Sequence, residues 1–332
     1  MDLDWFEHIT GFKEEPYAQT QQRLQARAGR LHADGRDTGY GIGRLEILSL
    51  GTLRQRVQAM DLPVGKLRAE VVQADVRELH RRAAGSGALF QVASQFNLLE
   101  MTGPDVTPED GVTRYATDHT QGPACAIAAG AGTIFRNYLM PLAGGMGQTA
   151  ARQVDGLAAL GEALGNRQGE LWTMRNGYAM ASAAGLRRID AALRQRSASE
   201  LDGLRDLLEV GVHWDVQVTE PGTQHQVTQV YCSALPVAYG SAPRALWAGF
   251  ATLVLEAAYE ATLLAGVLNA AATGNPLVYL TRLGGGAFGN DDAWIDAAMA
   301  RAMKLAQGHG IEVRLVSHGT PDPRLLELVR QA

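Results

Sequence analysis

The sequence predicts an α/β fold in which a mainly parallel or mixed sheet is covered by helices on both faces. In the later part of the chain, strand-like and helix-like segments alternate, which is the pattern of such sheets. The stretch Pro276–Asn290 (PLVYLTRLGGGAFGN) reads as a buried strand, a glycine loop and the start of a helix. Of the 332 residues, 46% are hydrophobic and 20% charged, which is typical of a globular protein with a large core.

The first 64 residues are expected to form an N-terminal extension packed on the core, which comprises residues 65–332. Apolar periodicity, Gly and Pro punctuation and β-branched runs place the early elements. Before residue 100 we expect helices at 17–31, 53–60 and 77–84 and strands at 44–50, 66–73 and 88–94.

A long polar connection at 98–120 follows, and loops of that length in a compact domain are usually functional or mobile. Ser199 is placed to cap one of the later helices. Of the later elements, we expect helices at 122–130, 199–208, 245–272, 291–307 and from 323, and strands at 132–142, 210–219, 226–234, 276–283 and 311–317, with a short β-like pair within 171–180.

The loop Gly284-Gly285-Gly286 is the strongest chemical signal. Successive glycines permit positive φ and allow backbone N–H groups to approach a phosphate closely. The helix that follows, from Asp291, is expected to direct its positive N-terminal end at the same place. The loop lacks the Lys and Ser/Thr of a P-loop and comes too late for a Rossmann fingerprint. Phe288 within it would suit packing against a sugar, although a tight turn without a ligand is the simpler alternative.

Polar residues at strand ends and in the long connection are the other candidates. Asp75 precedes a small helix, so it is either that helix's cap or a ligand contact. Asn97 is either a turn former or part of a site with the glycine loop. Glu100, Asp110 and Asp118 are candidate general bases, because a carboxylate near a diphosphate can have a raised pKa, although loop acids are usually just solvated. Weaker candidates for ligand contact are Arg114, Tyr115, Arg136 and Tyr138.

Charge and cysteine content limit the function classes. The formal net charge is −5, so bulk charge attracts the chain neither to nucleic acid nor to an anionic membrane. Cys125 and Cys232 have no metal-site spacing, and no signal peptide is visible, so we expect a cytoplasmic protein without a metal. The apolar tract 246–272 is interrupted by acids at near-helical spacing and is expected to be a buried helix.

Ala74-Asp75-Val76 after a strand, Asn97 closing the next buried strand, and GGGAFGN after a later strand resemble, in this order, the macrodomain family. Its members bind or hydrolyse ADP-ribose. Over residues 66–320 the resemblance implies a three-layer, macrodomain-like mixed sheet with insertions around 98–120 and 145–225. It implies adenine recognition by Asp75, ribose contact by Asn97 and diphosphate binding by the glycine loop. The implied ligand-binding residues are Asp75, Val76, Asn97, Gly284, Gly285, Gly286, Ala287, Phe288, Gly289 and Asn290.

The chain also departs from the family. The paired glutamates of poly(ADP-ribose) glycohydrolases are absent, and Gln121-Gly122-Pro123 stands near their place. Three hypotheses therefore remain: an enzyme that cleaves an ADP-ribosyl linkage, with Asp118 first and Glu100 second as catalytic residue, a non-catalytic ADP-ribose-binding module, or a protein of this fold for another phosphorylated nucleotide. The expected partner is ADP-ribose or an ADP-ribosylated macromolecule, and no cofactor is expected.

Overall fold

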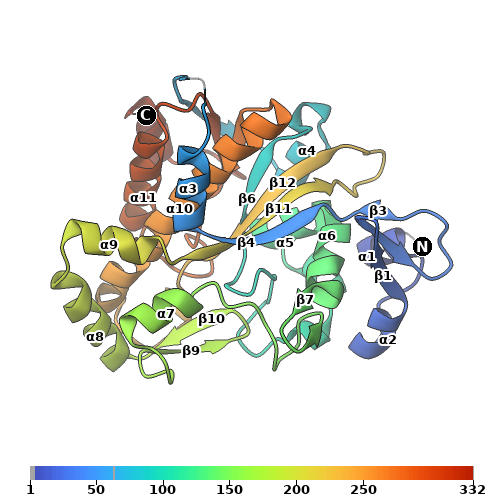
Figure 1. The fold of residues 1–332 in the computed structure, drawn as a ribbon, viewed down its shortest axis with the longest axis horizontal. Coiled ribbons are helices and arrows are strands. Elements are labelled where there is room, and N and C mark those ends of the chain that lie inside the picture. The colour runs from blue at the N-terminus through green and yellow to red at the C-terminus, as the bar shows by residue number, and fades with distance from the viewer. Residues whose placement is uncertain (1–3, 63, 332) are drawn as a thin grey trace.

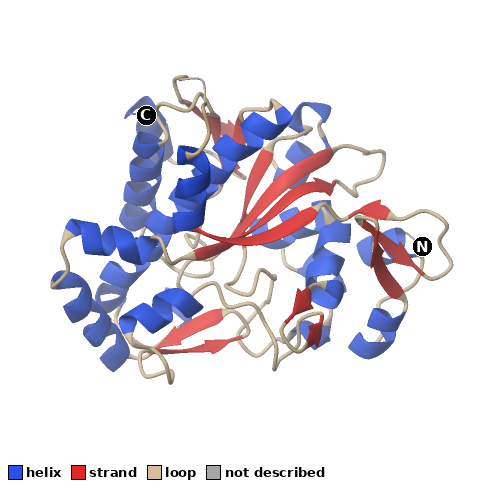
Figure 2. Cartoon of the chain, viewed as in Figure 1, coloured by secondary structure: helices blue, strands red, loops and turns tan. Residues whose placement is uncertain are grey.

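A computed structural model describes residues 4–62 and 64–331 and contains a central mixed sheet (Figure 2). Five neighbouring strands of this sheet run parallel to one another, namely β12, β6, β13, β14 and β5. At the other end of the sheet, β11 is antiparallel to both of its neighbours, β12 and β4. The α/β class with a mixed sheet is thus confirmed. In spatial order the strands are β4 (Arg44–Ser49), β11 (Glu209–Gln217), β12 (Gln226–Cys232), β6 (Leu89–Ala93), β13 (Leu277–Leu280), β14 (Glu312–Ser317) and β5 (Arg68–Gln73).

Helices cover both faces of the sheet, as the alternation of side chains along its strands requires (Figure 1). In β12, Val230 and Cys232 join the core on one face, and Tyr231 joins the core on the other. The first face carries α3 (Leu50–Gln58), α8 (Ala183–Arg194), α9 (Ala198–Arg205), α10 (Arg244–Thr273), α11 (Asp292–Leu305) and α12 (Pro323–Gln331). The second carries α4 (Val76–Arg81), α5 (Gln121–Ala128) and α6 (Gly130–Ile134).

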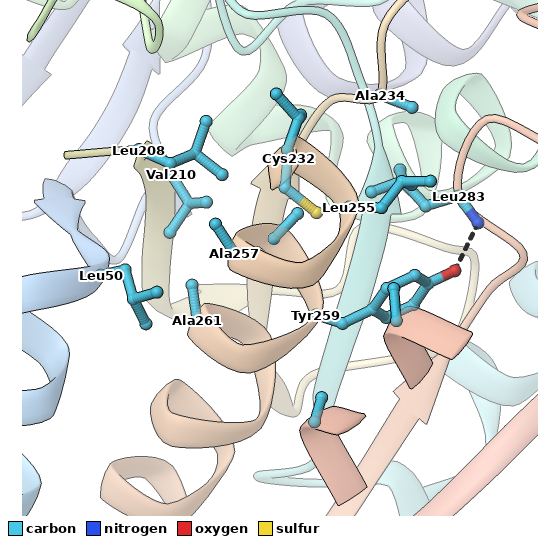
Figure 3. Close-up of a cluster of buried hydrophobic side chains, with 14 of the residues drawn as sticks. Leu50, Leu208, Val210, Cys232, Ala234, Leu255, Ala257, Tyr259, Ala261 and Leu283 are labelled. Carbon is cyan, nitrogen blue, oxygen red and sulfur yellow. Dashed lines mark hydrogen bonds between the residues drawn. The ribbon is translucent and has the colours of Figure 1, made fainter. Parts of the chain in front are cut away.

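The long helix α10 is the centre of the first face, as expected from its apolar tract. By length and composition it is the one described helix that could cross a membrane, but 78% of its most apolar window is buried inside the protein. Figure 3 shows Ala257 and Ala261 of α10 beside Leu50 and Val210 of neighbouring elements. From the same helix, the hydroxyl of Tyr259 accepts the N–H of Leu283 at 2.8 Å, just before the glycine loop.

The N-terminal segment differs from the single helix expected at 17–31. That helix, α2 (Tyr17–Gln22), stops early, and the chain forms a small sheet of β1 (Leu24–Arg27), β2 (Arg30–Ala33) and β3 (Tyr40–Gly41). Ala28 and Gly29 both have positive φ, 50° and 71°, which makes a hairpin turn there. The hairpin buries Leu24 and Leu31, so packing overrides the helix propensity of the Gln- and Arg-rich sequence.

Two other expectations need correction. Of residues 132–142, expected as a strand, 132–139 lie in α6 (Gly130–Ile134) and a π-helical turn (Phe135–Leu139) and only Pro141–Leu142 are a strand, because Gly130 and Gly132 let this helix pack closely against Ile9 and His213. The cap of α9 is Ser197, which exchanges hydrogen bonds with Glu200.

The expected N-terminal extension and the expected insertion at 145–225 both contribute elements to the main layers. Both β4 and α3 precede residue 65 and yet belong to the main layers, and β11, within the expected insertion 145–225, is a strand of the main sheet. The division at residue 64 stays a prediction. The remaining elements are α1 (Trp5–Thr10), α7 (Ala158–Leu164), β7 (Pro141–Leu142), β8 (Gly145–Met146), β9 (Trp172–Arg175) and β10 (Tyr178–Ala181).

Candidate functional site

A pocket with an empty volume of about 850 Å³ lies at the carboxyl ends of β12, β6 and β13. These three strands are adjacent and parallel, so their ends meet at one edge of the sheet. Open α/β sheets usually bind ligands at this edge. Residues 93–95 after β6, Ala234 after β12 and residues 281–284 after β13 form its floor. Its walls come from the 98–120 connection, the start of α5 and the glycine loop.

The glycine loop presents free backbone donors to this pocket. Within the part of the chain that the structure describes, the N–H groups of Gly286, Ala287 and Phe288 form no hydrogen bond, and all three residues line the pocket. Gly284 has φ of 75°, and a Cβ there would overlap Ala234, so this glycine is required by the fold. Successive free amides in a turn make a concave site for an anion.

The other predicted loop residues point elsewhere. A Cβ on Gly285 would lie 3.2 Å from Ile295, and one on Gly289 would lie 2.8 Å from Ala238, so both glycines pack against protein. Asn290 is buried and donates to the carbonyl of Leu235 at 2.8 Å. None of these three residues lines the pocket.

Of the two nearby helix N-termini, the one facing the pocket is not the one that the sequence indicated. The N-terminus of α11 is capped by its own Asp291, which accepts from Ala293 N–H at 3.0 Å. The N-terminus of α5 opens on the pocket through Thr120, Gln121 and Gly122, and the Thr120 side chain does not cap it. The partial positive charge at the N-terminus of α5 therefore adds to the free amides of the glycine loop in favouring an anion in the pocket.

Glu100 is the unusual carboxylate of the site. Only 2% of the residue is exposed, it lines the pocket, and its Oε1 has no hydrogen-bond partner. Burial raises the pKa of Glu100 well above its ordinary value; Asp118 raises it further, and the charge of Arg136 opposes the shift. A buried polar atom without a partner is rare in folded proteins and calls for an explanation. A carboxyl that takes part in proton transfer to a bound ligand is one.

The turn that carries Glu100 is held from several sides. Leu98, two residues earlier, has φ of 64°, which is unfavourable for a branched side chain. The guanidinium of Arg136 donates to the Leu98 carbonyl at 3.1 Å, and the hydroxyl of Tyr115 accepts the N–H of Glu100 at 3.0 Å. On the far side, Gln95 Oε1 accepts the N–H of Met101 at 2.6 Å. Strained backbone persists only where its surroundings fix it, and such places cluster at functional sites.

Three aromatic rings form one wall of the pocket. Phe288 lies 5.2 Å from Tyr178 and 5.6 Å from Tyr239, measured between ring centroids. Tyr178 also donates its hydroxyl proton to the Met101 carbonyl at 2.6 Å, which ties this wall to the segment carrying Glu100. Phe288 was predicted from its place in the glycine loop. Tyr178 and Tyr239 were not predicted as site residues. Tyr178 lies 110 residues before Phe288 and Tyr239 lies in a short turn, and no sequence motif connects either of them to the glycine loop.

The predicted residues Asp118 and Asn97 have different positions. Asp118 is half-buried and lines the pocket, with its Oδ1 accepting the N–H of Thr120 at 2.9 Å. Asn97 is fully buried outside the pocket. Its amide donates to Gln153 Oε1 at 2.8 Å and its oxygen accepts the N–H of Leu99 at 3.1 Å. Its ribose contact stays a prediction, which this geometry does not support.

Asp75 is the N-cap of α4, as the alternative interpretation had it, and accepts the N–H groups of Arg77 and Glu78 at 2.7 and 3.3 Å. It remains half exposed after β5 at the same edge of the sheet, but neither it nor the buried Val76 lines the pocket. Their adenine contact also stays a prediction. Of the weaker candidates, Tyr115, Arg136 and Tyr138 are fully buried beneath the site.

Within residues 4–62 and 64–331, no three His, Cys, Asp or Glu side chains are placed to hold a metal ion together. The side chain of Gln121 has a structural role. It accepts a hydrogen bond from the N–H of Ala93 and donates one to the carbonyl of Gln91, which connects α5 to β6. The chemistry available to the pocket is therefore that of two carboxylates, free backbone amides, a helix N-terminus and aromatic rings.

No protein-family model and no curated protein matches this sequence. Among solved structures, the chain is similar to poly(ADP-ribose) glycohydrolase from Thermomonospora curvata bound to the inhibitor ADP-HPD, with 16% identity, a TM-score of 0.42 and coverage of 95% of this chain and 96% of that one. It is also similar to poly(ADP-ribose) glycohydrolase from Deinococcus radiodurans in complex with ADP-ribose, with 12% identity, a TM-score of 0.46 and coverage of 86% and 93%.

Proposed function

We propose that the pocket binds an ADP-ribosyl group and that the protein hydrolyses the bond between that group and a macromolecule. The observation that carries this proposal is the position of Glu100. A buried carboxyl with an unpartnered oxygen lines the same pocket as residues whose backbone amides are free. This combination suits a ligand with an anionic centre and a bond to be cleaved beside it.

The diphosphate is proposed to lie between the amides of Gly286, Ala287 and Phe288 and the N-terminus of α5. Both supply backbone N–H groups, which favour an anion. The ring of Phe288 offers an apolar surface for the ribose next to the phosphates.

The two carboxylates are proposed to divide acid and base roles. Because burial raises the pKa of Glu100, this residue is protonated to higher pH than an exposed glutamate and acts as the general acid. Asp118, half-buried at the pocket wall, accepts a proton from the attacking water. The water oxygen bonds to the anomeric carbon of the distal ribose, the bond from that carbon to the leaving group breaks, and the leaving group takes the proton of Glu100. The products are free ADP-ribose and the unmodified macromolecule.

This arrangement also accounts for the missing glutamates near residues 121–123. A Cβ on Gly122 would overlap the carboxylate of Glu100, so Glu100 fills the space that a side chain at the start of α5 would enter. A carboxylate supplied by the preceding connection thus takes the place of one supplied by the helix. Glycine at 122 is required, since a Cβ there would overlap both the carbonyl oxygen of Ala93 and the carboxylate of Glu100.

Two measurements test the proposal. Calorimetry with ADP-ribose tests binding, which we expect at micromolar dissociation constants. Incubation with ADP-ribosylated proteins and ADP-ribosylated nucleic acids, with released ADP-ribose followed over time, tests the chemistry. Binding without release from any substrate would leave a non-catalytic ADP-ribose-binding module, and no heat at millimolar ADP-ribose would contradict both.

A further inference from the structure

The carboxylate of Glu14 joins the N-terminal segment to the connection at 98–120. Glu14 lies between the two, and its Oε1 accepts the N–H of Val112 at 2.7 Å while its Oε2 accepts the N–H of Thr113 at 2.7 Å. The hydroxyl of Tyr138 donates to the same Oε1 at 2.6 Å. Gly111, with φ of 80°, leaves room for the carboxylate, because a Cβ there would lie 2.6 Å from it.

The turn that Glu14 holds is connected to both proposed catalytic carboxylates, Asp118 and Glu100. Residues 113–117 form a short 3-10 helix whose C-cap is Asp118. In the same turn, Tyr115 is fully buried and its hydroxyl accepts the N–H of Glu100 at 3.0 Å. Asp118 is therefore covalently continuous with this turn, and Glu100 is connected to it by the hydrogen bond to Tyr115.

Apolar contacts support the same junction. Phe6, Ile9 and Phe12 of the N-terminal segment form one buried cluster with Val112 and Tyr115. Trp5 adds a hydrogen bond from its indole N–H to the Thr113 carbonyl at 3.3 Å. In Figure 1 the N-terminal elements lie beside α6, on the side of the molecule away from α8 and α9.

We propose that Glu14 is a positioning residue, through which the N-terminal segment holds the turn at 111–118 so that Glu100 and Asp118 face the pocket. This inference rests on the proposed function for its catalytic consequence. The mechanical part does not depend on it, since the hydrogen bonds of Glu14 hold the connection in place whatever the pocket binds. Two charge-assisted hydrogen bonds to successive amides are strong and directional, so their loss should free the turn locally.

The experiment compares Glu14→Ala with Glu15→Ala. Glu15 is the matched control: it is adjacent, exposed, and pairs with Arg23 at 3.0 Å without touching the connection. Hydrogen exchange of peptides covering 98–120 should be at least about tenfold faster in Glu14→Ala than in Glu15→Ala. ADP-ribose affinity should change less than about threefold, because the glycine loop is untouched, and the single-turnover rate should fall at least about tenfold.

The outcomes separate the two ideas. Unchanged exchange at 98–120 overturns the inference, and faster exchange with an unchanged rate overturns the positioning role. If the wild-type protein turns over no substrate, the proposed hydrolysis fails while exchange still decides whether Glu14 holds the turn. Should Glu14→Ala fail to fold, Glu14→Gln keeps one acceptor oxygen and cannot accept from both amides, and is expected to show a smaller change in the same direction.

Discussion

Two buried glutamates in this molecule have opposite surroundings. Glu260, on α10, is 5% exposed and is held by Arg54 at 2.6 Å and Arg301 at 2.6 Å. Glu100, beside the pocket, is 2% exposed, and its Oε1 has no partner. Burial is thus nearly the same, and the difference lies in the neighbours.

Desolvation of an ionised carboxylate is costly, and at Glu260 two guanidinium groups offset it. At Glu100 no guanidinium group in the described part of the chain pairs with the carboxylate, and the charge of Arg136 only partly opposes the effect of burial, so the carboxyl remains protonated to higher pH. Glu220 follows the first pattern, with Arg77 at 2.6 Å and Arg81 at 2.7 Å. The comparison teaches that a paired buried carboxylate belongs to the scaffold, whereas an unpaired one at a pocket is available for chemistry.

The largest expected effect is that of Glu100→Gln on the rate of ADP-ribose release. The amide keeps the shape of the side chain and cannot donate a carboxyl proton, so the single-turnover rate should fall by about 10² to 10⁴. Urea unfolding should show a protein at least as stable as the wild type at neutral pH. A rate within threefold of wild type on a verified substrate would remove Glu100 from the mechanism.

Asp118→Asn is the companion variant, and its rate should also fall at least about tenfold. If only this variant loses activity, the roles of the two carboxylates divide differently, and Glu100 serves to anchor the connection.

The second effect is on the free energy of unfolding and concerns Glu260, which pairs with Arg54 and Arg301. Glu260→Ala leaves Arg54 and Arg301 without their main partner and should lower the free energy of unfolding by about 3 kcal/mol. The value lies at the lower end for a broken buried pair because both arginines still contact Asp202. Denaturant unfolding measures it, and affinity of the folded protein for ADP-ribose should stay unchanged. Lost affinity at full folding would contradict the separation of scaffold and site.

The third effect concerns the glycine loop. At Gly286 a Cβ meets nothing within 4 Å, so Gly286→Val should fold and instead obstruct the pocket, weakening ADP-ribose binding by about tenfold or more. Gly285→Val is the matched control: its side chain would press on Ile295, so it should lower thermal stability more than affinity. Equal affinities of both variants and the wild type, by calorimetry, would mean that the loop is only a turn.

The smallest effect is on the pH dependence of stability. The folded pKa of Glu100 is raised, so its contribution to stability is fully present below the ordinary value of 4.5 and is lost as pH rises through the folded pKa. Glu100→Gln does not ionise. The free energy of unfolding of the variant, relative to wild type, should therefore increase as pH rises from about 4.5 and then level off. A difference that stays flat from pH 4 to 8 would show that Glu100 is not desolvated.

The sequence by itself determined the α/β class, most strands and long helices, and the glycine loop with Phe288. These follow from local features: apolar runs and glycines set strand, turn and helix with little help from distant residues. It also placed Glu100 and Asp118 in one connection, and both line the pocket.

Tertiary structure alone decided which carboxylate is buried without a partner. Glu100, Glu220 and Glu260 are chemically identical in the sequence, and only packing shows that arginines from distant elements reach the last two. Tertiary structure also decided that the N-terminus of α5, rather than that of α11, lines the pocket, and that the side chain of Asn97 is hydrogen-bonded to Gln153. Each of these outcomes depends on contacts between residues far apart in the chain, and the desolvation and pairing that set a carboxyl's pKa are properties of those contacts.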